Sequence, residues 1–190
     1  DYLIQRHGTA EGAIADGILA AVAAKADGSL GLPVSVSPEF RGSAMNAWGE
    51  NASFQLAALH MLADILPQAA DILGKDQDER WEAIDEKLPS YATVEGPVWL
   101  ETNGMIQERI GLWEGMDLYT SHRHHSHLAS IYPFKTIDPF SEDHHKIVEN
   151  SLNFWTLRGP GAWSGWCVPW ASVLNSRFDR TEAAGHWLHI

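Results

Sequence analysis

Cysteine and basic side chains are scarce in this chain. Cys167 is the one cysteine among 190 residues, which excludes an internal disulfide framework and any zinc site built from several cysteines. Lysine and arginine together number 13, against 25 aspartates and glutamates, for a formal net charge of −12. Because a protein that binds a phosphate backbone needs a basic stripe, we expect no nucleic acid partner.

Long apolar runs are also missing. The chain has no run of about 18 apolar residues and no recognisable signal peptide, so we expect no membrane span and no membrane partner. It opens at Asp1 without methionine and stops at Ile190 within a helical pattern. We therefore expect residues 1–190 to be a single segment of a larger domain, truncated at both ends.

Apolar and aromatic residues are plentiful. Hydrophobic residues make up 45% of the chain, enough for a sizeable core, and some of the nine tryptophans are expected to line a pocket. Helical spacing predicts helices over residues 9–25, 46–66, 76–88, 141–158 and 166–177, and a further one from residue 181. Within residues 46–66, Phe54, Ala58, Met61 or Leu62, and Ile65 are predicted to face the core. Pro67 is predicted to interrupt the helix, with a continuation over residues 69–73 after a kink that Gly74 closes. The residues predicted to point inward from the next two helices are Trp81, Ile84, Leu88, Ile147, Leu152 and Trp155.

Turn signals separate these helices. Asp27-Gly28 predicts a turn, and the prolines in residues 30–40 predict an extended segment or a structured loop. Asn103-Gly104 predicts a two-stranded hairpin within residues 98–109, since a type I′ turn needs positive φ at both central positions. Helices joined by long loops, with one short hairpin, predict a mainly α fold whose site is built from loops at one end.

The strongest candidate for a site is the histidine cluster, residues 122–127, which holds four of the ten histidines and an arginine. Three interpretations are open. His122, Arg123, His124 and His127 could donate hydrogen bonds to the hydroxyls of a sugar, or the histidines could lie in the core and bond backbone carbonyls. Third, His122 and His124 could ligate a metal, because alternate residues of an extended segment point to the same side.

Two glutamates are candidates for acid chemistry. Glu39 lies between Pro38 and Phe40, where limited solvation would raise its pKa and suit a general acid; the alternative is a surface glutamate after a turn. Glu108 shares a strand face with Ile106, so it needs either a partner or a function. The metal interpretation is the weakest for the histidine cluster, because the nearby acids, Glu114 and Asp117, have no recognisable ligand spacing.

The tryptophans near the end of the chain are candidates for sugar stacking. Trp166 and Trp170 are four residues apart on one predicted helix, so Trp170 is expected to lie in the core. Trp163 lies on the glycine-rich loop of residues 159–166. It is the better candidate to stack on a sugar ring, whose axial C–H face matches an aromatic surface.

Several motifs occur in one order along the chain: Asp27-Gly28, Pro33-Val-Ser-Val-Ser-Pro-Glu39, Asn103-Gly-Met-Ile-Gln-Glu108, His122-Arg-His-His-Ser-His-Leu128 with Tyr132-Pro133, and Gly165-Trp166 with Trp170. Over about residues 27–184 they resemble glycoside hydrolase family 95, which contains inverting α-L-fucosidases and some α-L-galactosidases. The histidine motif is the most specific of them.

The resemblance implies a part of an (α/α)6 toroid, a carbohydrate substrate and no cofactor. It implies that Glu39 is the general acid, that His122 or His124 binds the sugar, and that Glu108 and Trp166 lie near the site. It also implies export to the periplasm or outside of a bacterial cell. The sequence departs from the family's motifs where Arg109 replaces a tryptophan, which is expected to affect the leaving-group subsite, and where Cys167 replaces a serine.

The family's catalytic aspartate and asparagine pair have no counterpart within these 190 residues, because those motifs flank the matched region. Inversion needs a group on each side of the sugar, so we expect the segment alone to be inactive and the rest of the polypeptide to complete the toroid. Two alternatives stay open. One is another toroidal sugar enzyme, a phosphorylase or a polysaccharide lyase, and the other is a carbohydrate-binding segment without catalysis.

Overall fold

The computed structural model describes residues 16–17, 20, 22–42, 44–78, 80–97 and 106–189 and is mainly helical. Its α-helices and 3-10 helices are η1 (Met45–Ala47), α3 (Ser53–Ile72), α4 (Arg80–Lys87), η2 (Ser126–Leu128), α5 (His145–Arg158), α6 (Cys167–Ser176) and α7 (Thr181–Trp187). Short antiparallel strand pairs accompany them, so the predicted fold class, a part of an (α/α)6 toroid, is confirmed. No helix in these ranges is both long and apolar enough to cross a membrane.

The strands form three separate pairs. β1 (Ala23–Ala24) pairs with β2 (Leu30–Gly31), and β3 (Ser35–Val36) pairs with β4 (Trp48–Gly49). The turn between β1 and β2 is the predicted Asp27-Gly28, where Gly28 has φ of 84°. The helix predicted over residues 9–25 is wrong at its end, because Ala23 and Ala24 form a strand, and most of its remainder lies outside the described residues.

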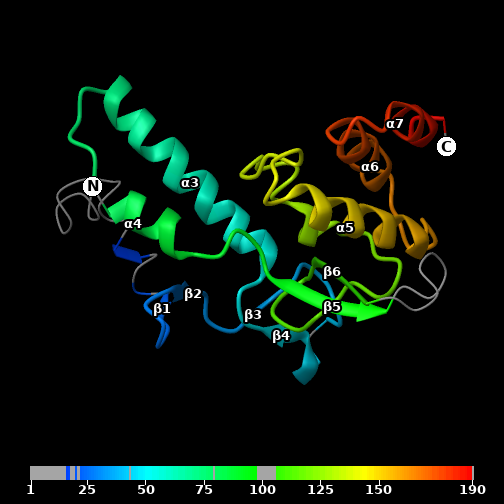
Figure 1. Cartoon of the computed structure of the whole chain (residues 1–190), viewed down its shortest axis with the longest axis horizontal. Helices are drawn as coiled ribbons and strands as arrows, with labels where there is room; N and C mark the ends of the chain where they lie inside the picture. Colours follow the sequence, from blue (N-terminus) through cyan, green and yellow to red (C-terminus); the bar gives the residue numbers. More distant parts are fainter. Residues whose placement is uncertain are drawn as a thin grey trace.

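The third pair is a hairpin that lies under α5 (Figure 1). β5 (Thr93–Pro97) pairs with β6 (Ile106–Ile110), from Thr93 opposite Ile110 to Pro97 opposite Ile106. A hairpin is therefore present, but its described first strand comes earlier than the predicted one, and Asn103-Gly104 lies outside the described residues. The Ser151 hydroxyl accepts a hydrogen bond from the Ile110 amide at 2.9 Å and fixes β6 against α5.

Helix α3 differs from its prediction in two ways. It runs through Pro67 without interruption, although it closes at Gly74 as predicted, where φ is 62°. A proline removes one hydrogen bond but keeps a helical φ, so it does not end a helix that is stabilised on both sides. The predicted face is also wrong, because Ile65 is 47% exposed and the buried side carries Leu56, His60 and Ala63.

Packing against α4 determines which side of α3 is buried. Figure 1 shows the two helices side by side, and Leu56 and Ala63 form one core cluster with Trp81, Ile84 and Leu88, the predicted inward residues of α4. His60 joins the two helices, since its Nδ1 bonds Asp85 and its Nε2 lies 3.1 Å from the Pro89 carbonyl oxygen. No sequence pattern had assigned a role to His60.

A second, larger core lies around α5, α6 and α7. The predicted inward residues of α5, Ile147, Leu152 and Trp155, are all buried there. Helix α5 starts later than predicted, at His145, and ends as predicted at Arg158 before Gly159, whose φ is 69°. This core supports the loops that carry the site.

Arg109, which stands where the family's motif has a tryptophan, is a buried charged residue next to this core. Its side chain is 2% exposed, and its Nη2 donates to Asp117 Oδ2 at 2.6 Å. Nη1 donates to the carbonyl oxygens of Gly96 and Gln107, and the guanidinium stacks on Phe154 at 4.0 Å. The charge is therefore compensated inside the protein.

The change Asp117→Asn is expected to lower the free energy of unfolding by about 3 kcal/mol, because it leaves the buried Arg109 charge without its counterion. Urea denaturation measures this loss. The matched control is Glu149→Gln, which removes the carboxylate from the exposed Lys146–Glu149 pair and should cost less than about 0.5 kcal/mol. Equal effects of the two changes would contradict the argument.

Candidate functional site

Glu39 lies on a left-handed turn directly after β3. The φ angles of Glu39, Arg41 and Gly42 are 54°, 59° and 58°. This turn sends neighbouring side chains to opposite sides: Phe40 is buried in the larger core, whereas Glu39 is 53% exposed. The expectation that Phe40 would limit the solvation of Glu39 is therefore wrong.

The Glu39 carboxylate meets two side chains of the histidine cluster. Nε and Nη2 of Arg123 both donate to its Oε2, and His124 Nε2 lies 2.9 Å from the same oxygen. The hydrogen bond with His124, followed by those with Arg123, lowers the pKa of Glu39 below its ordinary value. The predicted raised pKa is thus contradicted, because both contacts favour the charged carboxylate.

His122 lies beside the backbone of Glu39. The His124 amide donates to His122 Nδ1 at 3.1 Å, which assigns the proton of a neutral His122 to Nε2. That Nε2 points at the Glu39 carbonyl oxygen, 3.4 Å away, and the ring meets Phe40 edge-on at 5.6 Å. His122, Arg123 and His124 are therefore gathered around Glu39.

The histidine cluster divides into an outer and an inner part. His125 and His127 are buried, and His125 packs against the rings of Trp155, Trp163 and Trp170. Burial, together with neighbouring histidines, lowers the pKa of each to about 3. His127, predicted to bind substrate, is buried, which agrees with the alternative that places histidines of the cluster in the core. The backbone carbonyl bonds of that alternative are not seen among the described residues, where neither ring nitrogen of His125 and not Nδ1 of His127 has a hydrogen-bond partner.

Hydrogen bonds from distant segments hold the cluster in place. The hydroxyls of Ser37 and Ser126 lie 2.7 Å apart and join the extended segment before Glu39 to η2. The Cys167 thiol donates to the Arg123 carbonyl oxygen at 2.8 Å, a bond that the hydroxyl of a serine could also make. Ser121 donates to the Gly159 carbonyl at 2.6 Å and so anchors the glycine-rich loop.

Trp166 is more exposed than Trp163. Trp163 is half-buried: it stacks on Trp155 at 5.1 Å, contacts Trp187 at 4.7 Å and packs against the larger core. Trp166 is 48% exposed and meets the ring of His124 at 5.2 Å. It also lines an apolar groove of about 330 Å³ with Trp170, whose Nε1 donates to the Tyr132 carbonyl.

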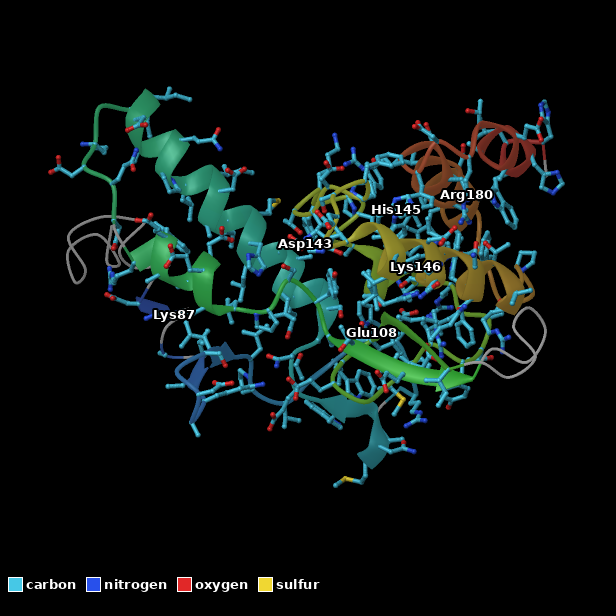
Figure 2. All side chains as sticks on the ribbon, in the orientation of Figure 1. Lys87, Glu108, Asp143, His145, Lys146 and Arg180 are labelled. Atoms are coloured by element: carbon cyan, nitrogen blue, oxygen red, sulfur yellow. The ribbon has the colours of Figure 1, made fainter. Side chains whose placement is uncertain are left out.

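Glu108 lies apart from this group. It is exposed on β6, below the start of α5, as Figure 2 shows. Its backbone oxygen accepts from Asn150, and its charge lies close enough to Tyr91 to help raise the pKa of that phenol, after burial, to about 12. Among the described residues, no hydrogen bond joins the Glu108 side chain to Glu39 or the histidine cluster.

The two acids weighed as metal ligands have other partners. Glu114 bonds Lys25 at 2.8 Å and also Asn51, while Asp117 pairs with Arg109. Within the ranges that the structure describes, no three His, Cys, Asp or Glu side chains are placed to hold a metal ion.

The site as a whole is an exposed carboxylate flanked by an arginine, two imidazoles and an open indole. Such a set can exchange a proton, bond several hydroxyls and stack on an apolar ring face. Sequence reasoning missed Arg41 and Tyr119, which bond each other at 2.8 Å beside Glu39, because no motif or spacing marks them.

The chain is similar to a known family of enzymes. Residues 14–189 match the family model described as the Glycosyl hydrolase family 95 catalytic domain. A comparison with curated proteins gave no match.

Proposed function

The chain belongs to glycosyl hydrolase family 95, a family of glycoside hydrolases that act on carbohydrates, and we propose that it is part of an inverting exo-glycosidase. Its proposed substrates are α-L-fucosyl or α-L-galactosyl linkages in oligosaccharides or polysaccharides. The observation that carries the proposal is the contact of Glu39 with Arg123 and His124, which puts a carboxyl group beside hydroxyl-binding side chains.

In the proposed reaction, Glu39 gives its proton to the glycosidic oxygen as the bond from that oxygen to the anomeric carbon breaks. A water molecule attacks the anomeric carbon from the opposite face, and a base takes one of its protons. His122, His124 and Arg123 bond the sugar hydroxyls, and Trp166 stacks on a ring face. The stacking role rests on the exposure of Trp166 and its contact with His124.

This role requires a protonated Glu39, whereas Arg123 and His124 favour its charged form. We propose that the substrate resolves this conflict. Sugar hydroxyls that accept hydrogen bonds from Arg123 would draw its guanidinium away from the carboxylate and so raise the pKa of Glu39. Binding of the substrate would then favour the protonated form of Glu39, which is the form that acts as the acid.

The base is proposed to come from elsewhere in a longer polypeptide. In the family the attacking water is handled by an aspartate and an asparagine pair, and the motifs that carry them have no counterpart in residues 1–190. The chain is therefore proposed to act as one segment of a larger (α/α)6 domain and to be inactive by itself.

The test is hydrolysis of α-L-fucosides and α-L-galactosides by the full-length polypeptide, followed by proton NMR during the first minutes. Inversion at an α-linked substrate releases the β-anomer first. Initial release of the α-anomer would refute the mechanism. Sugar binding without turnover would instead support the carbohydrate-binding alternative, which an ion-paired Glu39 also fits.

The change Arg123→Met is expected to move the basic limb of the kcat/KM profile to higher pH. Removing the guanidinium removes a cause of the lowered Glu39 pKa, and the acid then keeps its proton to higher pH. KM should rise about tenfold, because hydrogen bonds from a charged donor to the sugar are lost.

The control for this change is Lys146→Met, which removes an exposed cation on α5. It should leave both the limb and KM unchanged. A basic limb that stays in place or moves to lower pH in Arg123→Met would contradict the role given to the Arg123–Glu39 contact.

A further inference from the structure

We infer that Arg41 and Tyr119 form a clamp that holds the turn around Glu39 and so positions its carboxyl group for proton transfer. They are positioning residues, because they act through the backbone of the turn. The inference rests on the proposed acid role of Glu39 and adds two residues that no motif marks.

The turn needs a support of this kind. Glu39 and Arg41 are residues with side chains in the left-handed region, with φ of 54° and 59°. Such residues occupy this region at an energetic cost, so the conformation persists only where surrounding contacts impose it. If the turn relaxed, the direction of the Glu39 side chain would change with it.

Arg41 supplies contacts on both sides of the turn. Its Nη1 donates to the Asn46 carbonyl oxygen at 2.8 Å, which closes the loop that follows Glu39. Its Nη2 donates to the Tyr119 hydroxyl at 2.8 Å, across 78 residues of sequence. The guanidinium also lies 5.3 Å from the ring centre of Phe40 and 5.6 Å from that of Tyr119.

Tyr119 can anchor Arg41 because contacts with the core hold the loop that carries Tyr119. Leu118, the preceding residue, is buried, and Asp117 pairs with the buried Arg109. The Tyr119 ring meets Phe40 edge-on at 6.0 Å, although 51% of the side chain is exposed. An exposed aromatic ring that is held by an arginine and a core phenylalanine fits a fixed support beside the acid.

Besides Arg41, the turn has contacts before Glu39, at the Glu39 carboxylate and at the Glu39 carbonyl oxygen, which lies 3.4 Å from His122 Nε2. Ser37 bonds Ser126 before the turn, and the Phe40 amide donates to the Ser37 carbonyl at 3.2 Å. Arg123 and His124 hold the Glu39 carboxylate itself, and both are proposed to bond the substrate. When substrate takes these donors, Arg41 and Tyr119 remain to keep the backbone of Glu39 in position.

The experiment compares Tyr119→Phe and Arg41→Met with Glu39→Gln in the full-length polypeptide. On substrates with poor leaving groups, kcat should fall about tenfold in Tyr119→Phe and further in Arg41→Met, with less than about a threefold change in KM. On aryl glycosides with activated leaving groups the loss should nearly vanish, because these need little help from an acid.

Tyr91→Phe is the matched control, since it also removes one phenol hydrogen bond of 2.8 Å, to His144 Nδ1. It should leave kcat unchanged. Hydrogen exchange followed by mass spectrometry gives a readout without catalysis: exchange in residues 37–42 should speed up about tenfold in Tyr119→Phe and stay unchanged in Tyr91→Phe.

The outcomes separate this inference from the proposed function. An impaired Glu39→Gln enzyme together with an unimpaired Tyr119→Phe enzyme refutes the clamp alone, as does unchanged exchange in residues 37–42. A loss in Tyr119→Phe that is equal for good and poor leaving groups also refutes it, because general damage is not specific to the acid. An unimpaired Glu39→Gln enzyme refutes the acid assignment, and the clamp falls with it.

Discussion

The change Glu39→Gln is expected to lower kcat about 10³-fold on oligosaccharides, because the amide cannot protonate a poor leaving group. On aryl glycosides whose leaving group departs without a proton, the loss should be tenfold or less. The expected signature is therefore a steep dependence of rate on leaving-group acidity in the variant and a shallow one in the parent. Steady-state kinetics on a series of substituted aryl glycosides measures both slopes.

Two further observations sharpen this test. The basic limb of the kcat/KM profile should disappear in Glu39→Gln if that limb reports loss of the Glu39 proton. The matched control is Glu82→Gln, at an exposed position on α4, which should be fully active. Equal losses on good and poor leaving groups would remove Glu39 from the acid role and leave it as a residue that binds or orients the sugar.

The sequence predicted the buried face correctly for helices whose apolar residues lie on one side. In α4 and α5 the inward positions follow a single stripe, and Trp81, Ile84 and Trp155 are buried as predicted. Helix α3 has apolar residues on several sides, so spacing could not select the buried one. Contacts with α4 made that choice, and they placed His60 inside and Ile65 outside.

The histidine cluster was recognisable as a motif, but its division was not. The chain changes from an extended conformation to the 3-10 helix η2 within residues 122–127, so side chains do not simply alternate along the cluster. His125 is buried, whereas His124 is half-buried. The contacts of Glu39 could not be predicted from the sequence either. Its pKa depends on Arg123 and His124, more than 80 residues away in the chain, and local sequence carries no signal of such a contact.

Acidification from pH 7 to pH 5 is expected to lower the free energy of unfolding by about 2 kcal/mol for each of His125 and His127. Burial lowers the pKa of both to about 3 in the folded protein, whereas an unfolded histidine titrates near 6.5. Between these values the unfolded chain binds protons that the folded chain does not. Stability is therefore present above pH 6.5 and is lost as the pH falls toward 3.

Urea denaturation at half-unit intervals of pH, followed by tryptophan fluorescence, measures this slope. The change His125→Phe replaces one titrating ring with an aromatic ring that fits among Trp155, Trp163 and Trp170, and it should remove about half of the slope. The control is His186→Gln, at an exposed position on α7, which should leave the slope unchanged. A flat profile between pH 7 and pH 5 would mean that the folded and unfolded chains bind equal numbers of protons, so the inner histidines would be protonated in the folded state, and the lowered pKa values would be refuted.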